Sequence, residues 1–179
     1  MGEHRPAVFS ERDQRPTLVF ERILAHSPER VWSALTNHQQ LLDWHPTPFD
    51  IEPSEGGRVS FSSAVPDAPE IPEGTVLAWA PPSLLAYTWG EDELRWELRP
   101  HDEGCVLTLT HSFEDRFKAA RDAAGWHICL QALERSLRSP RATRPEGEPR
   151  LPADWKALND DYERRFGIAP EQATPPPQG

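Results

Sequence analysis

Histidine, cysteine and carboxylate side chains build most metal and catalytic sites, and the spacing of the histidines and cysteines in this sequence matches no such site. The seven histidines lack the H-x-H or H-E-x-x-H spacing that places two ligands on one ion. They stand at positions 4, 26, 38, 45, 101, 111 and 127. Cys105 and Cys129 belong to no C-x-x-C pair, so we interpret both as reduced packing residues. We predict no metal ligands and no cofactor.

Nucleophilic catalysis is not indicated either. The chain has no G-x-S-x-G motif and no glycine-rich phosphate loop. Asp43, Asp50 and Glu52 could serve as general bases in an enzyme, but solvation at the surface is the commoner role of such side chains. No catalytic residue is predicted.

Tryptophan is abundant, with seven in 179 residues, and several of these rings could approach one interior. The five candidates are Trp44, Trp79, Trp89, Trp96 and Trp126. Large rings with specific packing geometry suit a pocket for an apolar molecule, although each ring could equally belong to a packed core. His111 lies on the inward side of a predicted strand, where it could orient a ligand or be satisfied by a backbone carbonyl or Tyr87.

Alternation of apolar and polar residues predicts the strands that position these side chains. In residues 93–99 every odd residue is charged and every even one apolar, so Leu94, Trp96 and Leu98 should face a core. Further strands are predicted over 17–25, 58–62, 74–79, 84–89 and 105–113. Their expected inward residues include Leu18, Phe20, Leu24, Val59, Phe61, Leu77, Trp79, Leu85, Tyr87, Trp89, Cys105, Leu107, Leu109, His111 and Phe113.

Helical spacing is found in four segments. Ser27 and Pro28 suit a helix start, after which Val31, Trp32, Leu35 and Leu42 would form a buried face, and residues 38–44 would form a second short helix. A long helix carries Trp126, Leu130, Leu133 and Leu137 on one stripe. A last amphipathic helix carries Trp155, Leu158, Tyr162 and Phe166, with Gly167 as its C-terminal cap.

These elements predict an α+β fold of the helix-grip type, a curved antiparallel β-sheet wrapped around a long C-terminal helix, with an extra C-terminal amphipathic helix. A sheet with one apolar face must be covered, and the long helix is large enough to cover it; a β-sandwich with a peripheral helix is the alternative. We divide the chain into a flexible arm (1–16), the helix-grip domain (17–138), a linker (139–152), a docking helix (153–167) and a disordered tail (168–179). The last helix should dock on its own domain or be exchanged in a homodimer.

Net charge and hydropathy make some classes of binding partner improbable. Nineteen basic residues against 29 acidic ones give a net charge of −10, which disfavours nucleic acid. No apolar run reaches the roughly 18 to 20 residues of a membrane span, and the N-terminus lacks the apolar segment of a signal peptide. We therefore expect a cytoplasmic protein.

Several ordered stretches resemble the START-like (SRPBCC) superfamily and, within it, the domain of activators of the Hsp90 ATPase (AHSA1-like). They are SPERVWSALT at 27–36, Trp44, Gly56-Gly57, Pro81-Pro82, Tyr87-Thr88-Trp89, Leu107-Thr108-Leu109-Thr110-His111 and Gly125-Trp126, within residues 17–138. The resemblance implies a cavity between the sheet and the long helix, which relatives use for lipids, polyketides, hormones or other apolar molecules.

The resulting hypothesis is non-enzymatic binding of an apolar or aromatic small molecule in that cavity. Its expected lining is Phe61, Trp79, Tyr87, Trp89, Trp96, Leu109, His111, Phe113, Trp126 and Leu130. Two alternatives stay open: a cyclase- or hydrolase-type enzyme using the same cavity, and a protein-interaction role resembling that of an Hsp90 ATPase activator, with a chaperone as partner.

Overall fold

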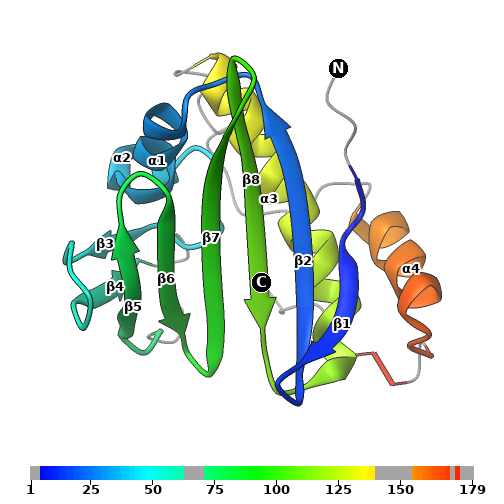
Figure 1. Cartoon of the computed structure of the whole chain (residues 1–179). Helices are drawn as coiled ribbons and strands as arrows, with labels where there is room; N and C mark the ends of the chain where they lie inside the picture. Colours follow the sequence, from blue (N-terminus) through cyan, green and yellow to red (C-terminus); the bar gives the residue numbers. More distant parts are fainter. Residues whose placement is uncertain (1–4, 63–70, 140–154, 170–171, 174–179) are drawn as a thin grey trace.

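The computed structural model describes residues 5–62, 71–139, 155–169 and 172–173 (Figure 1). The strands are β1 (Val8–Arg12), β2 (Arg15–Leu24), β3 (Phe49–Ile51), β4 (Arg58–Phe61), β5 (Gly74–Ala80), β6 (Leu84–Trp89), β7 (Asp92–His101) and β8 (Gly104–Ser112). The helices are α1 (Pro28–Thr36), α2 (His38–Leu41), the 3₁₀ turn η1 (Arg116–Lys118), α3 (Ala119–Arg138) and α4 (Trp155–Phe166). None of the helices in these ranges combines the length and apolar character that a membrane crossing needs.

One antiparallel sheet forms the body of the molecule, in the order β1-β2-β8-β7-β6-β5-β4-β3. The strands from β3 to β8 follow one another as a meander, and β2 then pairs with β8. Figure 1 shows α3 running across one face of this sheet, which we call the inner face, and α4 lying beside β1. The predicted α+β helix-grip fold is confirmed.

Alternation along β7 and β8 places the core as predicted. Leu94, Trp96 and Leu98 are at most 2% exposed, and the inward residues of β8 are buried opposite them. The β6–β7 connection is a tight turn in which Gly90 takes a positive φ of 60°, a conformation that glycine adopts without steric cost. The hairpins predicted at this turn and at residues 101–104 are both present.

The prediction for Leu77 is wrong. The β5–β6 register shifts between Val76 and Ala78, so Leu77 is the extra residue of a bulge and is 39% exposed, while Val76 takes the buried position. Beyond the bulge the alternation resumes one residue later, which returns Trp79 to the inner side opposite Leu85. After a bulge, each side chain lies on the face of the sheet opposite to the one that strict alternation predicts.

The helix that follows β2 begins as predicted. The Ser27 side chain accepts a hydrogen bond from the Arg30 amide, and Val31 and Leu35 are buried. Leu42 does not join them, because α2 ends at Leu41, and the Leu42 side chain is 41% exposed.

The N-terminal segment differs from the predicted arm, because residues 8–12 form the edge strand β1. The alternation of apolar residues in this segment is weak, and the contacts that order the segment come from residues distant in the sequence. The buried Arg22 guanidinium donates to the Arg5 carbonyl at 2.8 Å, and the Ala7 amide donates to the Tyr162 hydroxyl at 3.2 Å. The short strand β3 (Phe49–Ile51) was also not predicted.

Helix α3 carries the predicted buried stripe, with Trp126, Leu130, Leu133 and Leu137 at most 4% exposed. Four buried alanines near its start allow close packing: Ala119, Ala120, Ala123 and Ala124. Gly125 is not on this face, since a Cβ atom there would meet nothing within 4 Å.

Helix α4 packs on α3 and β1 of the same chain rather than standing free (Figure 1). Tyr162 is buried and lies 3.0 Å from His127 of α3, and the Phe166 ring lies 5.0 Å from that of Phe9. Most of the predicted linker and tail falls outside the described residues, but Ile168, which we assigned to the tail, is 4% exposed.

We expect Trp96→Ala to lower the free energy of unfolding by about 3 to 5 kcal/mol, because it empties a buried site against the face covered by α3. The matched control is Arg95→Ala on the same strand. Its side chain is 40% exposed and pairs with the similarly exposed Glu97, so the loss should stay under about 0.5 kcal/mol. Urea denaturation of both variants measures the difference, and equal losses would contradict the assigned inner face.

Truncation after Ser139 should lower the melting temperature of a monomer, since it exposes the side chains that α4 covers. Lys156→Ala is the control, because this side chain is 80% exposed and should leave the melting temperature within error. Calorimetry with size-exclusion chromatography reads both quantities. Conversion of a dimer to a monomer on truncation would instead indicate exchange of α4 between two copies.

Candidate functional site

A continuous group of aromatic side chains fills the space between α3 and the sheet. We call it the aromatic cluster; it consists of Trp44, His45, Phe49, Phe61, Tyr87, Trp89, Trp96 and Trp126. Neighbouring ring centroids lie 5.1 to 6.3 Å apart, mostly in edge-to-face or tilted arrangements. These are the distances at which aromatic pairs attract one another beyond simple burial.

These rings come from α3, from the loop after α2 and from the four strands β3, β4, β6 and β7. Trp126 comes from α3 and contacts Trp96 of β7 at 5.6 Å and Trp89 of β6 at 6.1 Å between centroids. Trp44, in the loop after α2, contacts Trp96 at 5.7 Å and is fixed by its indole N–H, which donates to the Ala34 carbonyl. Phe49 and Phe61 come from β3 and β4.

The cluster reaches the surface at one end. Phe61 and Trp89 are stacked with an interplanar angle of 25° and a centroid distance of 5.9 Å, and both are only half-buried. The rings behind them, including Tyr87 and Phe49, are at most 1% exposed. The Phe61–Trp89 pair therefore forms the rim of a buried aromatic interior.

Two polar side chains lie inside the cluster. His45 is fully buried; its Nδ1 accepts from the Thr47 amide at 3.1 Å, and its Nε2 lies 3.4 Å from the Tyr87 hydroxyl. Burial lowers the pKa of His45 to about 3, and burial raises the pKa of Tyr87 above its ordinary value. Both groups are consequently uncharged at neutral pH.

A second polar network borders the cluster where α3 begins. The Trp126 indole N–H donates to Nδ1 of His111 at 3.2 Å, and Nε2 of His111 lies 2.8 Å from the Asp92 carboxylate. Indole can only donate, so the His111 proton is on Nε2 and points at Asp92. Both ring nitrogens are engaged, which leaves His111 no lone pair with which to take a proton from a substrate.

Asp92 is the charged centre of this network. Burial opposes its ionisation, but the hydrogen bonds from His111 and Lys118, together with the charge of Lys118, outweigh burial and lower the pKa of Asp92. The Lys118 ammonium lies 2.7 and 2.6 Å from the two carboxylate oxygens of Asp92. Asp92 therefore forms a largely buried ion pair.

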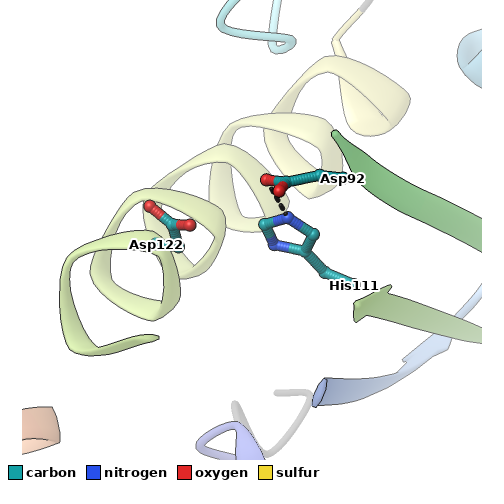
Figure 2. Close-up of side chains that lie close together, drawn as sticks. All are labelled: Asp92, His111 and Asp122. Atoms are coloured by element: carbon teal, nitrogen blue, oxygen red, sulfur yellow. Dashed lines mark hydrogen bonds and ion pairs between the residues drawn. The ribbon is translucent and has the colours of Figure 1, made fainter. Parts of the chain in front are cut away.

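Asp92, His111 and Asp122 offer ligand atoms that lie within 4.8 Å of one another, a grouping that could hold a metal ion (Figure 2). They come from the start of β7, from β8 and from α3, so no sequence spacing indicates them. Their present bonding does not fit a metal, because Nε2 of His111 carries a proton. The Lys118 ammonium, 3.8 Å from Asp122 and 2.6 Å from Asp92, also supplies the positive charge between the carboxylates.

The structure brings together most residues of the predicted lining. Phe61, Tyr87, Trp89, Trp96 and Trp126 are in the cluster, and His111 and Phe113 border it. Leu109 and Leu130 are buried, Leu109 opposite Trp96 on the neighbouring strand. Trp79 lies apart: its ring packs on Trp32 of α1, 5.1 Å away, and within the described residues it has no ring contact with the cluster.

His45 and Phe49 belong to the site but were not predicted. His45 lies in the α2–β3 connection and Phe49 is the first residue of the short strand β3, where no period of two or 3.6 marks an inward side. In the sequence, both residues stand close to Trp44 in a stretch rich in aromatic residues and proline. Such a composition does not predict which side chains point inward. Of the three acidic residues considered as bases, Asp50 and Glu52 are exposed and Asp43 is partly buried, and Glu52 pairs with Arg58.

Comparison with known proteins agrees with this fold. The model of the family described as Activator of Hsp90 ATPase homolog 1-like protein matches residues 25–138. A conserved protein of unknown function from Enterococcus faecalis is 22% identical, with 90% of each chain covered and a TM-score of 0.72. CalU16 from Micromonospora echinospora is 17% identical, covering 93% of this chain and 96% of its own, with a TM-score of 0.67.

A protein from Mesorhizobium loti is 27% identical over 70% of this chain and 98% of its own, with a TM-score of 0.59. No curated protein matches the sequence. Likeness at these identities shows a shared architecture, and the chemistry of the site has to be argued from its residues.

Burial of neutral His45 should make stability depend on pH. Its pKa is about 3 when folded and 6.5 in its ordinary state, so its stabilising contribution is complete above pH 6.5 and is lost as the pH falls toward 3. Between pH 6 and 4.5 the free energy of unfolding should fall by up to about 1.4 kcal/mol per pH unit on account of this group.

Denaturant titrations at several pH values measure this slope. His45→Gln should reduce it by about one proton, whereas His101→Gln, at an exposed turn, should leave it unchanged. Asp92 has a folded pKa lowered from 3.8, so its contribution is lost only below this window. An unchanged slope in His45→Gln would show that His45 titrates normally in the folded protein.

Proposed function

The chain belongs to the family of Activator of Hsp90 ATPase homolog 1-like proteins, and we propose that it binds an apolar or aromatic small molecule among the rings between α3 and the sheet. The binding is non-enzymatic, and the ligand is held chiefly by removal of its surface from water. The proposed compartment is the cytoplasm, where Cys105 serves as a buried thiol.

The observation that carries this proposal is the continuity of the aromatic cluster from a half-buried rim to a fully buried polar centre. Phe61 and Trp89 are half-buried and stack on each other at 5.9 Å, so a flat molecule can replace that stacking by inserting between or beside them. Behind the rim, a ligand would meet only rings and two uncharged polar groups. Burial of apolar ligand surface contributes about 25 cal/mol per Å² before the costs of association.

The enzyme alternative receives less support from the geometry. A general base needs a free lone pair within reach of a substrate. Both nitrogens of His111 are occupied by Trp126 and Asp92, and Nδ1 of His45 is occupied by the Thr47 amide. In both histidines the nitrogen that carries no proton already accepts a hydrogen bond from the protein, so neither is free to take a proton from a substrate.

The Hsp90-activator alternative follows from the family description and would use the outside of the molecule. Among the described residues, the large apolar side chains most exposed there are Val8 and Ile23, at 63% and 56%. Isolated exposed side chains of this kind are common on protein surfaces and do not mark an interface. The aromatic cluster is therefore the feature on which we base the proposed function.

The uncharged dye Nile red should bind the native protein with an increase in fluorescence. Phe61→Ala and Trp89→Ala should each weaken binding about five- to tenfold, because each removes ring surface from the rim. Leu77→Ala is the control, since it deletes an apolar side chain of similar size that points away from the cluster.

Fluorescence titration at a fixed protein concentration gives the dissociation constants, and circular dichroism establishes that each variant is folded. Failure of the wild-type protein to bind the dye would overturn the proposal. Equal weakening by Leu77→Ala would show that the dye binds elsewhere on the surface.

A further inference from the structure

The hydrogen-bond donors and acceptors around the Tyr87 hydroxyl do not balance. This oxygen is completely buried, with the Tyr87 side chain at 0% exposure, so water at the surface cannot complete its bonding. The protons that point toward it can be assigned from the chemistry of its neighbours. The resulting inference deepens the proposed function and rests on it.

The first neighbour is His45. The Thr47 amide donates to its Nδ1 at 3.1 Å, and a backbone N–H cannot accept. A neutral imidazole carries one proton, which must then be on Nε2. Nε2 lies 3.4 Å from the Tyr87 oxygen, so His45 is the donor of this long bond and Tyr87 is the acceptor.

The Tyr87 oxygen therefore already accepts one N–H group, which comes from the α2–β3 loop. Trp96 of β7 cannot accept the remaining proton, because indole nitrogen is a donor only.

The proton of the Tyr87 hydroxyl itself has no acceptor among the described residues. The group bonded to this oxygen, His45, is a donor, and the ring neighbours Phe49 and Phe61 have no polar atom. A buried donor without an acceptor destabilises a protein by about 1 to 3 kcal/mol, so such groups are rare unless something else completes them.

We propose that the Tyr87 hydroxyl donates a hydrogen bond to an acceptor oxygen of the bound molecule, which makes the ligand an uncharged aromatic ketone or a similar planar carbonyl compound. The hydrogen bond from His45 occupies a lone pair of the hydroxyl and leaves its proton among the rings of the aromatic cluster. Tyr87 is the residue that selects an oxygen-bearing ring system over a plain hydrocarbon.

We infer an uncharged ligand from the positions of the cationic side chains, which lie away from the aromatic cluster. In the described part of the chain, the cations that lie over aromatic rings are Arg22, Arg116 and Lys118. They contact Phe20, Phe117 and Phe113, none of which belongs to the cluster. A carboxylate ligand beside Tyr87 would be buried without a counter-ion, at a cost that one hydrogen bond cannot offset. A carbonyl oxygen accepts the same bond without that cost.

The test uses two probes of the same shape, 2-acetylnaphthalene and 2-isopropenylnaphthalene, in which a C=CH₂ group replaces the C=O group. Their dissociation constants are measured by isothermal titration calorimetry with wild-type protein and with Tyr87→Phe. The ratio of the two constants should change by about tenfold between the proteins, because only the ketone loses a partner. Affinity for the hydrocarbon should stay within about twofold.

Tyr162→Phe is the matched control, since it removes the hydroxyl of the other tyrosine, which lies between α4 and β1, and should leave the ratio unchanged. If Tyr87→Phe does not fold, infrared spectroscopy of the ketone bound to wild-type protein decides the question. Its carbonyl stretch should lie below the value in hexane.

The outcomes separate the two proposals. If neither probe binds the wild-type protein, the proposed function fails, and this inference fails with it. If both probes bind and the ratio is the same in Tyr87→Phe, or if the carbonyl band stays at its hexane position, the small-molecule function stands and the role of Tyr87 is refuted.

Discussion

Packing of α3 on the inner face of the sheet is the interaction on which the rest of this structure depends. Strands such as β7 alternate charged and apolar side chains, and the apolar face is stable only when a second layer removes it from water. Trp126 stands at the centre of that contact. Its ring meets Trp89 and Trp96, while its N–H reaches His111 on β8. The aromatic cluster and the polar network beside it both follow from the position of this one side chain.

The two polar groups of the interior are stabilised in different ways. Around His111 each donor has an acceptor, from the Trp126 N–H through the imidazole to Asp92, whose charge Lys118 balances. Such a matched network fixes side-chain orientation and leaves nothing for a ligand to complete. Around Tyr87 the donors outnumber the acceptors, and this imbalance is the reason we place ligand recognition there and not at the more conspicuous Asp92–His111 pair.

Much of the fold could be predicted because one-sided burial leaves a periodic record in the sequence. Residues 93–99 indicate their inner face directly, and Leu130 and its helical neighbours indicate the face of α3. The predictions were wrong where the period is interrupted or weak. The bulge at Leu77 changes which residues face the core, and nothing in the local composition marks it. The strand β1 is ordered by contacts from Arg22 and Tyr162, which lie far away in the sequence.

The sequence by itself determined the α+β helix-grip fold and identified five of the eight rings in the cluster as lining residues, because burial on one side of a strand or helix is a local property. Only the tertiary structure decided which of those rings meet. It placed Trp79 in a separate contact with Trp32, turned His45 of a loop and Phe49 of β3 inward, and gave His111 the partners Trp126 and Asp92. Hydrogen bonds between side chains distant in sequence depend on strand register and turn geometry to within about an ångström, and an apolar pattern does not specify position so finely.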